Sequence, residues 1–263
     1  MSTKTLDQAS APIDTHSEIS WTNMLEQALT APGQMGNTYN RFYRYSFGNQ
    51  LLLWMQGIDE PVNTYDRWKK MGRLPQKGLT KYTIMVPILI KDKENIDPVT
   101  GQPKIKFMKF KYVRALIKLS DTIGDDLPEP TIPNWDLNKA LEALDIKQEP
   151  FKMTDGNVQG YSFERTVTVN PVAVYPMKTR LHEIAHVLLG HTTREDYAEH
   201  RGECEFQAEA VAYLLMHELG MDEHMNAAES RAYIQNWLKG ETPSAAACRQ
   251  VFSTVEKILK AGQ

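Results

Sequence analysis

Two histidines four residues apart, His182 and His186, enclose a glutamate, Glu183. On a helix, residues four apart share a face, so both imidazole rings can bind one metal ion. The glutamate then lies beside water on that ion, where it serves as the general base rather than as a ligand. Catalytic zinc usually takes three protein ligands and one water, whose pKa falls to about 7. The motif therefore predicts a zinc hydrolase, with Mn²⁺ or Co²⁺ as alternative ions.

The residues around the motif indicate a buried helix that ends near Gly190. A core helix with two satisfied histidines is the alternative interpretation, but two buried imidazoles beside a carboxylate favour a metal. His191 is expected to finish this helix, where an imidazole can meet free carbonyl groups, and His217 is expected to be structural. The apolar residues of the helix are Leu181, Ile184, Ala185, Val187, Leu188 and Leu189.

The third ligand must come from elsewhere in the chain. A metzincin would carry glycine and histidine where this chain has Leu189 and Thr192, so that family is excluded. The next helical run, 203–216, places Glu209 at the edge of an apolar stripe, and a carboxylate there needs a partner such as a metal. Glu209 is the predicted ligand. Glu205, one turn earlier, is the rival and is interpreted as a solvated charge near the helix start.

Composition restricts where such a site works. The chain has 263 residues, 41% of them hydrophobic, which is enough for one large or two modest cores. It has only two cysteines, which favours a reducing compartment over a disulfide framework. No apolar run approaches the length of a membrane span, and residues 1–20 lack the apolar region of a signal peptide. We expect a soluble protein in the cytoplasm of a bacterial host, with no membrane partner.

Charge is divided unevenly along the chain. Residues 21–120 hold 16 Lys and Arg against seven Asp and Glu, whereas residues 121–263 hold 13 against 23. This asymmetry indicates a basic module for polyanions joined to an acidic one. The acidic, proline-containing segment between them reads as a linker. The predicted organisation is a disordered tail at 1–19, a domain at 20–119, a linker at 120–134 and a second domain at 135–263.

The basic half carries residues suited to single-stranded nucleic acid, in which charges follow phosphates and rings stack on unpaired bases. Aromatic rings and arginines alternate over 39–45, and a basic region begins near 67. Strands are predicted at 82–90 and 104–113, the second with a bulge at Met108 and a row of lysines on one face. A solvated sheet face is the alternative for such a row. The predicted DNA contacts are Arg41, Tyr43, Arg44, Tyr45, Lys69 and Lys70.

Three N-terminal motifs resemble the N-terminal domain of ArdC-type antirestriction proteins: 49–54 (NQLLLW), 64–68 (TYDRW) and 76–78 (QKG). The His182 motif and Glu209-Ala210 resemble the metallopeptidase domain of the same proteins, in the same order. The resemblance implies a single-stranded-DNA-binding domain fused to a zincin-like metallopeptidase domain, which protects the incoming DNA of mobile elements from host restriction. It also implies His182, His186 and Glu209 as ligands and Glu183 as base. The segment 186–191 resembles the ImmA/IrrE peptidase pattern instead.

These observations predict an α+β protein of two domains. A small antiparallel sheet with helices would bind single-stranded DNA, and a mainly helical domain, with a strand over 161–169, would hydrolyse a protein substrate that the sequence does not name. Tyr175 or Tyr213 is the candidate for stabilising the oxyanion. Two alternatives remain open: an ImmA/IrrE-like regulatory protease that cleaves a repressor, and a DNA-binding module whose metal site is not catalytic.

Overall fold

The computed structural model describes residues 20–30, 44–98, 100–127, 134–155, 157–238 and 242–263. In these residues the chain combines helices with small, mostly antiparallel sheets, which confirms the predicted α+β class. The chain divides into two compact units: one contains the described residues of 52–128, and the other those of 16–51 and 129–263.

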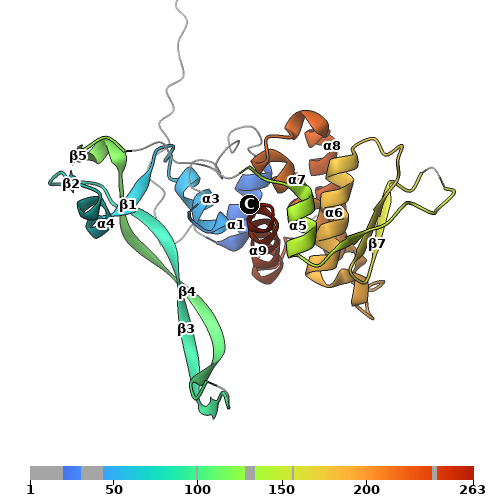
Figure 1. The fold of residues 1–263 in the computed structure, drawn as a ribbon, viewed down its shortest axis with the longest axis horizontal. Coiled ribbons are helices and arrows are strands. Elements are labelled where there is room, and N and C mark those ends of the chain that lie inside the picture. Colours follow the sequence, from blue (N-terminus) through green and yellow to red (C-terminus); the bar gives the residue numbers. More distant parts are fainter. Residues whose placement is uncertain (1–19, 31–43, 99, 128–133, 156, 239–241) are drawn as a thin grey trace, which may run out of the picture. The chain divides into compact units, whose positions relative to one another are not determined.

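The first unit is built on a three-stranded antiparallel sheet in the order β1-β4-β3. Strand β1 (Val62–Thr64) pairs only with the end of β4 (Pro103–Lys118), and β3 (Tyr82–Ile96) pairs with β4 along most of its length. Much of β3 and β4 therefore forms a two-stranded ribbon that extends beyond β1 (Figure 1). Pro87 lies in β3, an outer strand of this sheet, as a proline within a strand requires.

The ribbon differs from its prediction in length and in the position of its bulge. Strand β3 runs to Ile96, six residues beyond the predicted strand 82–90, and β4 begins at Pro103 and runs to Lys118, beyond the predicted 104–113. Met108 pairs with Leu89 in regular register. The register shifts instead where Ile90 pairs with Phe107 and the next residue pairs with Ile105, so Lys106 is the extra residue.

A short helix packs against the strands of this unit. Thr64 caps α4 (Tyr65–Lys70) by accepting a hydrogen bond from the Arg67 amide. Trp68 is fully buried and donates its indole N–H to the Ile117 carbonyl at 2.8 Å, which ties the helix to β4. Strands β2 (Arg73–Pro75) and β5 (Thr122–Gly124) pair with each other, with the 3₁₀ turn Leu119–Asp121 before β5.

The second unit is mainly helical. Its centre is α7 (Arg201–Glu218), which is buried almost throughout from Phe206 to its end and packs against α6 (Pro176–Leu189), α8 (Ala227–Leu238) and α9 (Ala245–Ala261). Helix α5 (Leu137–Ala143) packs on α9 and is capped by Asp136. Short 3₁₀ turns follow α6 at His191–Thr193 and precede α8 at Asp222–His224.

A small sheet lies against α6 in the order β6-β8-β7 (Figure 1). Strand β8 (Thr166–Val169) pairs in parallel with β6 (Lys147–Gln148) and antiparallel with β7 (Gly160–Phe163). The predicted single strand over 161–169 is therefore a hairpin. Glu164 has φ +47°, a left-handed conformation, and lies in its turn.

The compact units and the predicted domains differ at the N-terminal side. Helix α1 (Trp21–Thr30) packs on α9 and α7, and the ring of Phe252 contacts Trp21 at 5.9 Å and Phe47 at 5.8 Å between centroids. The division falls within α3 (Phe47–Met55), after Leu51. Of the helices described, none has both the length and the apolar character needed to cross a membrane.

Candidate metal centre

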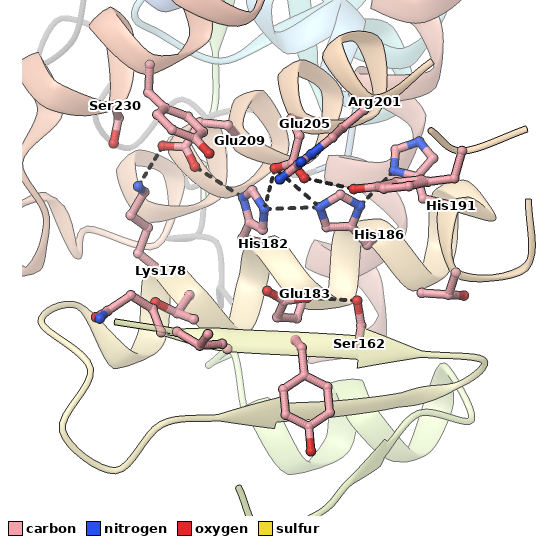
Figure 2. Close-up of a pocket in the computed structure, with 18 of the residues that line it drawn as sticks. Ser162, Lys178, His182, Glu183, His186, His191, Arg201, Glu205, Glu209 and Ser230 are labelled. Atoms are coloured by element: carbon pink, nitrogen blue, oxygen red, sulfur yellow. Dashed lines mark hydrogen bonds and ion pairs between the residues drawn. The ribbon is translucent and has the colours of Figure 1, made fainter. Parts of the chain in front are cut away.

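Two neighbouring helices supply the side chains of the predicted metal site. Helix α6 begins with Pro176 at its first position and presents His182 and His186 on one face. Helix α7 presents Glu205 and Glu209, also four residues apart, toward them (Figure 2). The packing of α6 on α7 therefore brings together two imidazoles and two carboxylates from segments about 25 residues apart in the chain.

Three ligand atoms converge between the helices. The Nε2 atoms of His182 and His186 are 3.0 Å apart, and Glu205 Oε2 lies 3.5 Å from the first and 3.8 Å from the second. Among the described residues these three side chains form the one His/Cys/Asp/Glu group compact enough to hold a metal ion. Their side chains are between 8% and 15% exposed, so water still reaches the cluster.

Glu209 occupies a different position from the one predicted. Its Oε2 lies 3.1 Å from Nδ1 of His182, on the far side of the ring from the cluster. Its Oε1 lies 2.6 Å from Nζ of Lys178, an ion pair without hydrogen-bond geometry. Glu209 therefore holds the outer nitrogen of His182, while Glu205 faces the inner nitrogens of both histidines. The two glutamates lie one helical turn apart, so helical periodicity in the sequence does not separate their roles.

A series of hydrogen bonds reaches Nδ1 of His186, the ring nitrogen that faces away from His182. Nδ1 of His186 lies 3.0 Å from Nδ1 of His191, and Nε2 of His191 lies 3.1 Å from Oε1 of Gln207. The amide of Gln207 donates to Gln250 Oε1 at 2.7 Å. His191 was expected to finish α6, but it lies in the 3₁₀ turn that follows Gly190, whose φ of +79° reverses the chain.

These contacts test whether a cation fits. Gln207 Oε1 accepts, so His191 donates through Nε2 and accepts through Nδ1, which leaves Nε2 of His186 without a proton. Glu209 accepts from Nδ1 of neutral His182, which leaves Nε2 of that ring bare as well. The Nε2 lone pairs of His182 and His186 and the Oε2 atom of Glu205 then point at one another, and only a proton or a cation between them satisfies all three acceptors. The residues present therefore fit a divalent metal ion.

The electrostatics of the cluster agree with that fit. Burial lowers the pKa of His182, but hydrogen bonds to Glu205 and Glu209 and the charge of Glu183 outweigh it and raise the pKa to about 10. Burial raises the pKa of Glu205, yet its contacts with His182 and His186 bring it well below its ordinary range. Burial and the neighbouring His186 lower the pKa of His191 to about 4, so this ring is neutral at pH 7. In the metal-free protein, a proton on His182 thus takes the place of the cation.

Glu183 faces the sheet rather than α7 (Figure 2). Ser162, on β7, donates its hydroxyl to Glu183 Oε2 at 2.7 Å. Gly160, on the same strand, allows this close approach: a Cβ atom there would lie 2.7 Å from Thr179 Cγ2, 2.9 Å from the Thr168 carbonyl oxygen and 3.4 Å from Glu183 Cγ. The β7 strand therefore positions the predicted base, a role that the sequence pattern of 161–169 did not indicate.

The cluster opens into a cleft of about 830 Å³, lined by residues of β7, α6, α7 and α8. Tyr197 lines it and donates its hydroxyl to Glu205 Oε1 at 2.8 Å. Burial, followed by the charge and hydrogen bond of Glu205, raises the pKa of Tyr197. Neither tyrosine suggested for the oxyanion is among the described residues lining the cleft, and Tyr213 is fully buried. Tyr197 is the tyrosine beside the cluster.

The predicted DNA contacts fall in different parts of the chain. Arg41 and Tyr43 lie outside those residues. Arg44 is exposed and Tyr45 is half-buried just before α3, where the Tyr45 carbonyl accepts a hydrogen bond from Gln50 at 2.8 Å. Lys69 and Lys70 are exposed in the last turn of α4. These lysines and Arg44 belong to different compact units.

Comparison with known proteins gives a family match for the N-terminal part of the chain. Residues 13–114 match the model of the N-terminal domain of anti-restriction factor ArdC. The metal-free crystal structure of the antirestriction ArdC protein from the R388 plasmid is similar, with a TM-score of 0.51, 18% identity and coverage of 92% of this chain and 94% of that one. The Mn(II)-bound structure of the same protein is similar with a TM-score of 0.54 and 16% identity, and the match covers 92% of this chain and 97% of that one. A search of curated proteins finds no match. Residues 13–114 thus match an ArdC N-terminal domain, and the fold of the chain is similar to that of the R388 ArdC protein.

Proposed function

We propose that this protein is an antirestriction protein that binds single-stranded DNA through its basic N-terminal half and hydrolyses peptide bonds at a divalent metal site in its second unit. The convergence of His182, His186 and Glu205 carries the hydrolase part. The excess of basic residues in 21–120 supports the DNA part. The family of the N-terminal domain supports the antirestriction role.

We assign the metal ligands to Nε2 of His182, Nε2 of His186 and Oε2 of Glu205. Glu209, the ligand expected from the sequence, acts in this assignment on the outer nitrogen of His182 and fixes its tautomer and orientation. A site of two imidazoles and one carboxylate suits zinc. The R388 ArdC protein has been crystallised with Mn(II), which supports a divalent ion and makes manganese the second candidate.

A divalent ion held there would act as a Lewis acid that lowers the pKa of water and polarises a substrate carbonyl. Glu183 would take the proton from that water and pass it to the leaving amine. Ser162 holds Oε2 of Glu183, so that the carboxylate keeps one orientation beside the cluster. Tyr197, which lines the cleft, donates its hydroxyl proton to Glu205 Oε1 and so fixes the orientation of that carboxylate toward the cluster.

The small sheet supports an extended peptide as the substrate. Among the described strands, ordered β6-β8-β7, β7 pairs on one side only, so its other edge offers backbone groups to an added strand. Gly160, Tyr161 and Ser162 of this strand line the cleft beside Glu183. A peptide laid along this edge would bring its scissile bond to the base and the metal ligands.

Exposed cations of the first unit support binding to a polyanion. Besides Lys69 and Lys70, the ribbon places five lysines at exposed positions: Lys91, Lys93, Lys104, Lys109 and Lys111. Exposed apolar side chains lie among them, including Leu89 and Phe110. Lysines beside flat or apolar side chains are the combination that single strands use, with charges following phosphates and rings meeting bases.

The hydrolase part is tested with an unstructured protein such as β-casein. We expect wild-type protein loaded with Zn²⁺ or Mn²⁺ to cleave it and EDTA to stop the reaction. Glu183→Gln should slow cleavage by about 100-fold or more, because the general base is lost, while the bound metal remains. Equal cleavage by wild type and Glu183→Gln would remove Glu183 from the mechanism. Metal binding without any cleavage by the wild type would favour the non-catalytic alternative.

The DNA part is tested by gel shift with a labelled single-stranded oligonucleotide. Lys69→Glu with Lys70→Glu should weaken binding by about tenfold, because phosphate contacts are replaced by repulsion. Lys139→Glu with Lys147→Glu makes the same charge change at exposed positions of the second unit and should have little effect. The first pair should also lose protection of unmethylated plasmid DNA entering a restricting strain. No shift with wild type at low salt would contradict the DNA part.

A further inference from the structure

We propose that His191 is a positioning residue of the metal site: it accepts the Nδ1 proton of His186 and so keeps His186 in the tautomer whose bare Nε2 faces the metal. This inference rests on the proposed assignment of His186 as a ligand. It gives His191 a role in metal binding without making it a ligand, because each of its ring nitrogens already has a partner in His186 or Gln207.

The direction of each hydrogen bond in the series His186–His191–Gln207–Gln250 follows from the last bond, between the two glutamines. Gln207 donates its amide to Gln250 Oε1, so its carbonyl oxygen is the atom that faces His191. A carbonyl oxygen can only accept, which places the proton of His191 on Nε2 and leaves Nδ1 as an acceptor. His186 must then donate through Nδ1, and its own Nε2 is left without a proton.

Without that acceptor, His186 could carry its proton on Nε2 instead, with the N–H aimed into the cluster. A protonated Nε2 cannot bind a metal, so part of the population would have to change tautomer before binding. The ring would also lose the contact that fixes its orientation. His191 is only 5% exposed, so solvent cannot readily replace it as the acceptor.

The fold places His191 for this task through one turn. Gly190 ends α6 with φ +79° and ψ +13°, and the 3₁₀ turn that begins at His191 follows directly. The reversal returns the His191 ring to the side of His186, with ring centroids 5.0 Å apart. Gln207 reaches His191 from α7 through its carbonyl oxygen, and its amide nitrogen contacts Gln250 of α9.

Two amide substitutions separate this role from simple packing. In His191→Asn, the Oδ1 atom can occupy the place of Nδ1 and accept from His186. In His191→Gln, the amide reaches the place of Nε2, keeps the contact with Gln207 and leaves His186 without its acceptor. Glutamine matches the volume of histidine better than asparagine does, so a purely structural role predicts the reverse order. His191→Phe fills the space and has no acceptor at either place.

The measurement is Zn²⁺ affinity of the full chain, by competition with a chromophoric chelator, together with the visible spectrum of the Co²⁺-loaded protein. We expect His191→Asn to bind within about threefold of wild type and to keep its Co²⁺ spectrum. His191→Gln and His191→Phe should bind about 10- to 100-fold more weakly, the usual effect of losing the partner of a metal-binding histidine. Thermal unfolding in EDTA checks that the metal-free variants are folded.

Equal affinity in all three variants would overturn the inference, as would a loss in His191→Asn as large as in His191→Gln. Glu205→Gln serves as the reference for the site itself. If Glu205→Gln bound Zn²⁺ as tightly as wild type, the assignment of Glu205 as a ligand would fail, whereas the positioning role, which rests on His186, would still be decided by the His191 variants. If Glu205→Gln lost binding while the His191 variants did not, only the role of His191 would be wrong.

Discussion

The choice of ring nitrogen decides the role of each residue in the proposed metal site. His182 uses its outer nitrogen for Glu209 and His186 uses its outer nitrogen for His191, so both inner nitrogens meet at Glu205. The spacing of His182 and His186 predicted a shared helix face, because that feature follows from helix geometry alone. The choice between Glu205 and Glu209 depends on which ring atom each carboxylate meets, and sequence does not encode that directly.

Metal binding should release a proton. His182 has its pKa raised to about 10 in the metal-free protein and is therefore protonated at pH 7. A cation must displace that proton, so we expect about one proton per ion at pH 7 and an affinity that rises about tenfold per pH unit while His182 remains protonated. Calorimetry in buffers of different ionisation enthalpy measures the number of protons. A heat that is independent of the buffer would show that His182 is already neutral.

The secondary-structure elements around the site are held close by small residues and by packing between distant segments. Prediction succeeded for α6, whose apolar residues recur with helical period, and for the main part of α7. It failed for the β7–β8 hairpin because the alternation of 161–169 continues through a turn at Glu164. It did not place α1 with α9, since an amphipathic helix shows that it has a buried face but not which partner covers it.

Gly160→Ala should destabilise the second unit and disturb Glu183. The added Cβ atom would lie within 3 Å of Thr179 and of the Thr168 backbone, so β7 must move away from α6. We expect a loss of about 1–3 kcal/mol in the free energy of unfolding, typical of overpacking. Thermal or urea unfolding measures it. Ser162→Ala, on the same strand, removes the hydrogen bond to Glu183 without a clash and should cost less; equal losses would contradict this account of Gly160.

Phe252→Ala tests the packing of the N-terminal helices on α9. Phe252 is 2% exposed and contacts the rings of Trp21 and Phe47. Its truncation should cost about 3–5 kcal/mol, as for other buried phenylalanines. Chemical denaturation should show the loss in the transition of the metal-binding unit, followed by release of bound metal. Ser253→Ala, exposed on the same helix, is the control. A negligible loss for Phe252→Ala would mean that α1 and α3 do not stabilise this unit.

At the scale of the whole molecule, the two proposed activities belong to different parts of the chain. The side chains of His182, His186 and Glu205 and the cleft beside them lie in the second unit, whereas Lys69, Lys70 and the ribbon lysines lie in the first. The division of charge in the sequence likewise indicates a basic module joined to an acidic one. The sequence did not predict that 16–51 would join the second unit, because that grouping depends on tertiary contacts across more than 200 residues.

Metal removal should therefore leave DNA binding nearly unchanged. We expect EDTA to alter the affinity for a single-stranded oligonucleotide by less than about twofold, since no metal ligand lies among the proposed contacts. Raising salt from 50 to 200 mM should weaken binding by about 50-fold if about four phosphates are neutralised. Fluorescence anisotropy measures both effects. Loss of DNA binding in EDTA would instead couple the two activities, and a flat salt response would exclude phosphate contacts as its basis.

Zn²⁺ affinity of Glu205→Gln and Glu209→Gln tests the central claim most directly, because the two variants make the same isosteric change one helical turn apart. Glu205→Gln should weaken binding by about 100-fold or more, which is about the share of one ligand in a structural zinc site. Glu209→Gln keeps an oxygen that accepts from His182 Nδ1, so it should stay within about tenfold of wild type. Tight binding by Glu205→Gln together with loss of metal from Glu209→Gln would contradict the assignment of Glu205 as the third ligand.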